Sequence, residues 1–149
     1  MLVDTSVWVD HFRRGNAALA ERLNRGEVRS HPFVTGELSC GNLRRRKEIL
    51  SFLSTLPQAM LAGHEEALTF VESNRLMGRG IGWIDVHLLA SARLTGIPLW
   101  TLDRRLKEVA GSLGLGPTIP TGLRTRSSRE RVRKRNPSAE HSARRRPGS

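Results

Sequence analysis

The sequence predicts an α/β fold in which short parallel strands alternate with helices. Short apolar runs, such as residues 1–3 and 98–102, alternate with segments whose apolar residues repeat at helical spacing, such as residues 84–95. Strands separated by helical segments form βαβ units, and these units build parallel sheets. A chain of 149 residues is about the size of one domain with one hydrophobic core. We expect functional side chains at the carboxyl ends of the strands.

The expected elements follow one another in the order that such a fold requires. Strands are expected over residues 1–3, 27–30, 58–61 and 98–102, with an edge strand at 118–119. Helices are expected over residues 6–14, 17–25, 34–46, 64–76, 84–95 and 104–113, and one more carries Ile49, Leu50, Leu53 and Leu56 on one stripe. The inward faces are expected to hold Ala67, Leu68 and Val71 in one helix and Leu88, Leu89 and Ala92 in another.

The positive charge of the chain is concentrated at its end. The formal net charge is +11, of which residues 121–149 carry +8 from ten basic residues and two acids, leaving +3 for residues 1–120. A basic chain favours an anionic partner such as nucleic acid. The end is rich in Arg, Ser and Pro, and it has too few apolar residues to offset the entropy of ordering. We therefore expect a folded domain over residues 1–120 and a disordered Arg-rich tail over 121–149.

The cysteine content and the hydropathy indicate a cytoplasmic protein. Cys40 is the only cysteine, so no disulfide framework is possible within the chain, and a lone thiol fits a reducing compartment. The first residues do not resemble a signal peptide. No apolar run approaches the roughly 20 residues that a membrane span needs. We expect a soluble protein with no membrane partner.

Four acids occupy positions where a parallel sheet gathers functional groups. Asp4 and Asp103 directly follow two predicted strands, and Glu37 and Asp85 fall in the first turns of two predicted helices. Four carboxylates that converge on one cleft repel one another and need a cation between them. Hard oxygen ligands suit Mg²⁺ or Mn²⁺.

Each of these acids also has a structural explanation. Asp4 and Asp103 are well placed as N-caps of the helices that follow them, and Glu37 and Asp85 are favoured near helix N-termini by the helix dipole. Capping is the better explanation for any one acid taken singly. For all four together we favour a site, because apolar residues surround Asp4, Asp85 and Asp103 in the sequence.

Four segments of the chain, in order, resemble the four motifs of PIN domains. They are residues 2–8 (LVDTSVW), 34–38 (VTGEL), 82–90 (GWIDVHLLA) and 100–106 (WTLDRRL). Together they are similar to the VapC-type toxins over roughly residues 1–115. The longer, more basic tail departs from the family pattern, and the resemblance assigns it no role.

The resemblance implies a PIN-like three-layer α/β/α domain with a short parallel sheet. It implies a metal-dependent endoribonuclease that hydrolyses RNA phosphodiester bonds and serves as the toxin of a VapBC-type toxin–antitoxin system. Carried over by position, Asp4, Glu37, Asp85 and Asp103 become catalytic acids that bind Mg²⁺ or Mn²⁺. Thr5, Ser6 and Thr101 become candidates to orient a carboxylate or a water through their hydroxyl groups, with turn and cap chemistry as an equal alternative.

The resemblance implies two partners, an RNA substrate and a VapB-type antitoxin. Transfer RNA is among the substrates of the family. The sequence does not decide whether the protein forms a homodimer. Arg104 and Arg105, beside Asp103, are the best candidates for phosphate contacts. Stacking on bases is open to Trp8, Trp83 and Trp100, but with so few aromatic residues we expect packing roles. Trp8 and Phe12 share a helical face that is a candidate partner surface, and Asp10 is expected to face solvent.

Several other functions compete with this interpretation. One is a PIN nuclease that processes RNA without an antitoxin. A haloacid-dehalogenase-type phosphatase also places an Asp after its first strand, but it needs a second Asp where this chain has Ser6. A receiver domain needs an acidic pair and a late lysine that the chain does not show. The non-enzyme alternative is an RNA-binding module driven by the basic tail, with the acids as helix caps.

Overall fold

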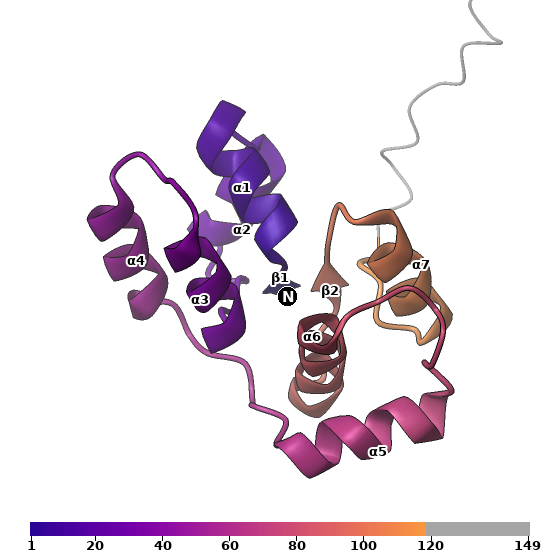
Figure 1. Ribbon diagram of the computed structural model, residues 1–149. Coiled ribbons are helices and arrows are strands. Elements are labelled where there is room, and N and C mark those ends of the chain that lie inside the picture. The colour runs from indigo at the N-terminus through magenta and orange to yellow at the C-terminus, as the bar shows by residue number, and fades with distance from the viewer. Residues whose placement is uncertain (119–149) are drawn as a thin grey trace, which may run out of the picture. The chain divides into compact units, whose positions relative to one another are not determined.

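The computed structural model describes residues 1–118, which contain two short strands and seven helices (Figure 1). These elements are β1 (Leu2–Val3), α1 (Thr5–Arg14), α2 (Ala17–Asn24), α3 (Pro32–Cys40), α4 (Arg46–Thr55), α5 (His64–Asn74), α6 (Trp83–Thr95), β2 (Leu99–Trp100) and α7 (Arg104–Ser112). The alternation of strands and helices predicted from the sequence is confirmed.

The sheet is parallel, and its carboxyl edge carries two of the four acids. β1 pairs with β2 in the register Leu2 with Leu99 and Val3 with Trp100. Asp4 follows β1 directly, and its backbone N–H donates to the Trp100 carbonyl at 2.9 Å. Since both strands run in the same direction, the segments that follow them emerge at the same edge.

Helices lie on both sides of this sheet. In Figure 1 the strands lie at the centre, with α1 to α4 toward one side and α6 and α7 toward the other. α1 packs on α3, α3 on α4, α5 on α6, and α6 on β2. Leu88, Leu89 and Ala92 of α6 are fully buried, as their spacing predicted. This arrangement confirms the predicted three-layer α/β/α fold.

Two of the expected strands are reduced to single bridges. Leu2 bridges Arg29, and Ser30 bridges Gln58, both in the parallel sense. The segments expected over 27–30 and 58–61 therefore extend the sheet without forming strands. The ladder on this side is held by few hydrogen bonds, including Arg29 N–H to the Met1 carbonyl at 2.8 Å.

α3 begins earlier and ends earlier than the predicted helix over residues 34–46. Pro32 occupies the first turn, where its missing N–H costs nothing. Gly41 takes an extended conformation, φ −83° and ψ 163°, which stops the helix after Cys40. A separate helix, α4, then begins at Arg46.

Three predicted side-chain environments are wrong. Leu68 is 43% exposed, so it does not face inward with Ala67. Trp8 is fully buried and stacks on Phe12 with ring centroids 5.6 Å apart, so it is not available as a partner surface. The side chain of Asp10 is 16% exposed, because it accepts hydrogen bonds from Arg14 and Asn16.

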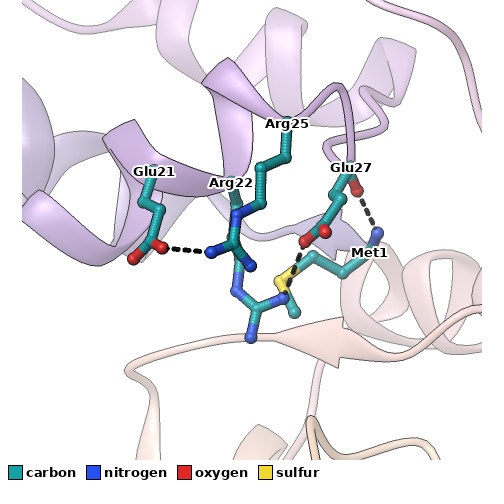
Figure 2. Close-up of polar contacts among 5 residues, drawn as sticks. All are labelled: Met1, Glu21, Arg22, Arg25 and Glu27. Atoms are coloured by element: carbon teal, nitrogen blue, oxygen red, sulfur yellow. Dashed lines mark hydrogen bonds and ion pairs between the residues drawn. The ribbon is translucent and has the colours of Figure 1, made fainter.

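The start of the chain is attached to the segment that follows α2. Figure 2 shows the Met1 ammonium donating to the Glu27 carbonyl, and Arg22 pairing with the Glu27 carboxylate at 3.2 Å. A second pair in the same view, Arg25 with Glu21 at 2.5 Å, lies on the exposed surface. These contacts, with the backbone bridge at Arg29, hold β1, the strand directly before Asp4.

The remaining sequence predictions concern the end of the chain and the membrane. Thr118 is not in a strand, and Ile119 and the expected disordered tail over 121–149 lie outside the described residues. Within residues 1–118, none of the helices has both the length and the apolar character to span a bilayer.

Candidate active site

Asp4 is the most enclosed of the four acids, with 7% of its surface exposed. One of its oxygens, Oδ2, accepts from the Ser6 hydroxyl at 2.7 Å and from the Thr101 hydroxyl at 2.8 Å. The Ser6 backbone N–H, 3.4 Å away, adds the contact of an N-cap. Among the described residues no group donates to Oδ1, so the second oxygen is left for a ligand from outside.

The two hydroxyls have fixed roles. Ser6 Oγ accepts from the Leu102 N–H at 2.9 Å, and Thr101 Oγ1 accepts from the Asp103 N–H at 3.0 Å. Since each hydroxyl carries one hydrogen, both hydrogens point at Asp4. The Asp4 carboxylate is thereby attached to the backbone that leads from β2 to Asp103. The same side chains make turn contacts with the backbone and hydrogen bonds to the Asp4 carboxylate.

Glu37 is attached to the start of α1 through Thr5. The Thr5 hydroxyl donates to Glu37 Oε2 at 2.5 Å. Thr5 is the first residue of α1, directly after Asp4, whereas Glu37 lies in the middle of α3. This contact brings the carboxylate of α3 toward the residue that ends β1.

Asp85 shows most directly that the four acids share one environment. Its side chain accepts from the Gly82 N–H at 3.0 Å, a contact that closes the first turn of α6. Burial raises the pKa of Asp85, the Gly82 hydrogen bond opposes this shift, and the negative charges of three other carboxylates raise it further. Those three are Asp4, Asp103 and Glu37. The acids that the sequence singled out are therefore close enough to act on one another electrostatically.

Asp103 is exposed and caps α7, accepting from the Leu106 N–H at 2.9 Å through Oδ1. Asp4 caps α1 in the same way. Capping is thus real for both residues, but it occupies one oxygen of each carboxylate. The remaining oxygens are free of protein donors within residues 1–118, so a cap and a ligand are compatible roles.

The four acids do not form a metal-binding cluster within residues 1–118. Among the described residues, no three Asp, Glu, His or Cys side chains are placed so as to hold one metal ion together. Within residues 1–118, none of the four acids takes part in an ion pair. Like charges repel, so carboxylates that converge on one site need a cation between them. The donor set of hard oxygens fits a divalent cation.

The two candidate phosphate contacts differ in their surroundings. Arg104 pairs with Glu108 at 3.3 Å on the exposed face of α7. Arg105 lies across the loop before α6, where a Cβ on Gly80 would come 2.7 Å from its Nη1. Gly80 has φ +77°, a conformation that favours glycine. Neither arginine pairs with an acid of the candidate site.

Sequence reasoning missed His31, a buried residue at the third segment of the sheet edge. It follows the bridging residue Ser30 and caps α3, with Nδ1 accepting from the Phe33 N–H at 3.0 Å. The opposite ring nitrogen, Nε2, lies 3.1 Å from the Ser91 hydroxyl of α6. Burial lowers the pKa of His31 to about 4, with a further contribution from the charge of His87. Its position directly before Pro32, which starts the helix, was the available signal.

Comparison with known proteins agrees with this geometry. The family model for the PIN domain matches residues 1–112. Two curated relatives, both named Ribonuclease VapC32, come from Mycobacterium tuberculosis strains CDC 1551 / Oshkosh and ATCC 25618 / H37Rv. Each is 42% identical over 116 residues, which cover 77% of this chain and 94% of the relative. The chain therefore belongs to the PIN domain family, as a member of the VapC type.

Proposed function

We propose that this protein is an endoribonuclease of the VapC type that hydrolyses RNA phosphodiester bonds with the help of Mg²⁺ or Mn²⁺. We propose further that it is the toxin of a toxin–antitoxin pair and acts in the cytoplasm, where its RNA substrates are. One observation carries the catalytic part. Burial raises the pKa of Asp85, the charges of Asp4, Asp103 and Glu37 raise it further, and within residues 1–118 none of the four acids pairs with a cationic side chain.

The four acids are proposed to hold the cation through the oxygens that the fold leaves free. Asp4 offers Oδ1, because Ser6 and Thr101 both donate to Oδ2. Glu37 keeps Oε1 free, because Thr5 donates to Oε2. A positive charge among them favours the ionised form of Asp85 and so opposes the shift that its neighbours cause. Carboxylates whose other oxygens are held by hydroxyls are well oriented ligands.

When bound, a divalent cation lowers the pKa of a water molecule and offsets the negative charge of the phosphodiester. The residues of the chain supply orientation. Thr101 and Ser6 fix the Asp4 carboxylate to the β2 edge, and Thr5 joins Glu37 to the start of α1. Arg104 and Arg105 are proposed to bind RNA phosphates beside Asp103. Structured RNA, transfer RNA included, is the proposed substrate class.

The same charge that binds a cation offers a site for inhibition. Four carboxylates are a suitable partner for an arginine, whose planar guanidinium binds carboxylates through two hydrogen bonds. We propose that a VapB-type antitoxin inserts a basic side chain among the four acids. Expression of the protein alone should then slow growth, whereas Asp4→Asn should not. Equal toxicity of the two proteins would show that the harm does not come from this site.

The experiment that tests the catalytic proposal is RNA cleavage by purified protein freed of any partner. Wild-type protein should cleave structured RNA with Mg²⁺ or Mn²⁺ and stop when a chelator is added. Asp85→Asn should reduce the rate by at least about 100-fold, because it removes a ligand and not merely its support. Glu72→Gln is the matched control, since this glutamate is exposed on α5. Cleavage that survives the chelator, or Asp85→Asn at the wild-type rate, would contradict the proposal.

A further inference from the structure

The three tryptophans of the chain have different environments. Trp8 is fully buried, and Trp100 is half-buried and packs against the core. Trp83 is 40% exposed and Phe33 is 38% exposed, and neither belongs to the buried hydrophobic core. The expected packing role is fulfilled by Trp8 and Trp100, whereas Trp83 packs on neighbouring rings and also presents surface to solvent. Two large aromatic rings lie at the surface, where water contact is unfavourable.

These two exposed rings are joined by a buried one. His87 is 6% exposed, and its ring meets the Trp83 ring at 4.7 Å and the Phe33 ring at 4.8 Å, both edge to face. The centroids of Phe33 and Trp83 are thus separated by no more than about 9.5 Å. The His64 ring lies 5.4 Å from Trp83, and the His31 ring lies 5.2 Å from Phe33. These ring contacts hold Trp83 and Phe33 in place.

The cluster lies near two of the four acids, Glu37 and Asp85, because the same two helices carry both. Trp83 is the first residue of α6, two residues before Asp85. Phe33 is the second residue of α3, one helical turn before Glu37. Residues one turn apart share a helix face. Trp83 is also at the N-terminus of α6, where backbone N–H groups favour a neighbouring phosphate.

We propose that Phe33 and Trp83, with His87 between them, form a stacking site for an unpaired RNA base next to the phosphodiester that the acids cut. This inference rests on the proposed function and names part of its substrate: RNA with an unpaired nucleotide at the cleavage position. Aromatic rings stack on bases that are turned out of a helix, and they do so with little dependence on base identity. A paired base has both faces covered and cannot use the site.

The test compares Trp83→Ala and Phe33→Ala with two controls. Trp83→Phe keeps an aromatic face, and Leu94→Ala removes a side chain of similar exposure, 42%, from the C-terminal end of α6. Binding is measured with Mg²⁺ in the Asp85→Asn background, so that no RNA is cut. The probes are a short single-stranded RNA of mixed sequence, the same RNA in a duplex, and the same backbone with its bases removed. Melting temperatures verify that each variant is folded.

Each alanine variant should weaken binding of the single strand by about 5- to 100-fold, the range for loss of one stacked base. Binding of the duplex and of the backbone without bases should change by less than about twofold, and Trp83→Phe should restore most of the affinity. Leu94→Ala should bind all three probes as the parent does. With a cleavable RNA and an intact Asp85, the loss should appear in KM and largely spare kcat.

Two results would overturn the stacking site. One is equal affinity of the Trp83→Ala and parent proteins for the single strand. The other is an equal loss on all three probes, which would indicate a backbone contact. If Trp83→Ala instead loses binding to a co-expressed antitoxin while RNA binding is unchanged, the rings form a protein contact and the proposal is wrong. In each case cleavage that still requires Asp85 would leave the ribonuclease proposal standing, so the two failures are distinguishable.

Discussion

Mild acid should destabilise this protein through His31. In the folded state Nδ1 of this ring accepts a hydrogen bond from the Phe33 N–H, so Nε2 carries the hydrogen and donates to the Ser91 hydroxyl. A proton added to Nδ1 would face the Phe33 N–H as a second donor and break the cap of α3. The ring is 2% exposed, so water cannot replace the lost contact. The helix affected is the one that carries Glu37 and Phe33.

The size of the effect follows from the shift in pKa. The His31 pKa is about 4 in the folded protein and 6.5 in the unfolded chain. As pH falls below the unfolded value, the unfolded chain takes up a proton that the folded protein refuses, and stability is lost. The free energy of unfolding should fall by about 2 kcal/mol between about pH 7 and about pH 5, and by about 3 kcal/mol as the pH reaches about 4. Below the folded pKa this loss should stop.

The assay is urea unfolding across this pH range, with His31→Asn as the comparison. Asparagine is a good N-cap and can accept from the Phe33 N–H, but it does not titrate. The variant starts less stable because it loses the contact with Ser91, and its stability should depend less on pH. The difference in unfolding free energy between the two proteins should therefore shrink toward acid. A difference that stays constant over the whole range would refute the role assigned to His31.

Three further predictions follow from the site and the charge distribution. Asp85→Asn should raise the melting temperature of metal-free protein by a few degrees, because it removes one of four repelling charges. The gain should vanish with saturating Mg²⁺. A metal-free melting temperature below that of the wild type would contradict this prediction. Thr101→Val should lower the free energy of unfolding by about 1–3 kcal/mol and the cleavage rate by about 10- to 100-fold, because the buried hydroxyl joins Asp4 to the Asp103 backbone. Denaturation measures the stability and single-turnover kinetics measure the rate. A loss of stability with unchanged cleavage would show that Thr101 does not position Asp4. Deletion of residues 121–149, which carry a charge of +8, should leave the melting temperature and the single-turnover cleavage rate nearly unchanged. It should make the salt dependence of RNA binding shallower. Loss of folding, or of cleavage at saturating RNA, would show that the tail belongs to the domain.

The sequence predicted the layers of the fold because its apolar periodicities are strong. The stripe of Leu88, Leu89 and Ala92 is that of a buried helix, and the residues are fully buried. Strand lengths were less predictable, since a segment such as 27–30 forms one bridge and its extent depends on neighbours that the local pattern does not specify. Pro32 and Gly41 set the ends of α3, and both residue types are typical of helix ends.

Positions in the candidate site were easier to predict than contacts. Asp4 directly follows β1 and Asp103 comes three residues after the end of β2, so a parallel sheet brings them to one edge. The donation of the Ser6 and Thr101 hydroxyls to a single oxygen of Asp4 depends on side-chain geometry that spacing does not contain. The same holds for His31 and for the exposed Trp83, whose environments depend on how α3 meets α6.

The central claim, that four carboxylates bind one divalent-cation centre for RNA cleavage, is tested most directly by calorimetric titration of Mn²⁺ into partner-free protein. Wild type and Glu72→Gln should bind Mn²⁺ with the same affinity, Asp85→Asn should bind at least about tenfold more weakly, and cleavage rates should follow occupancy of the site. Equal Mn²⁺ affinity in wild type and Asp85→Asn, or full cleavage with the site empty, would contradict the claim.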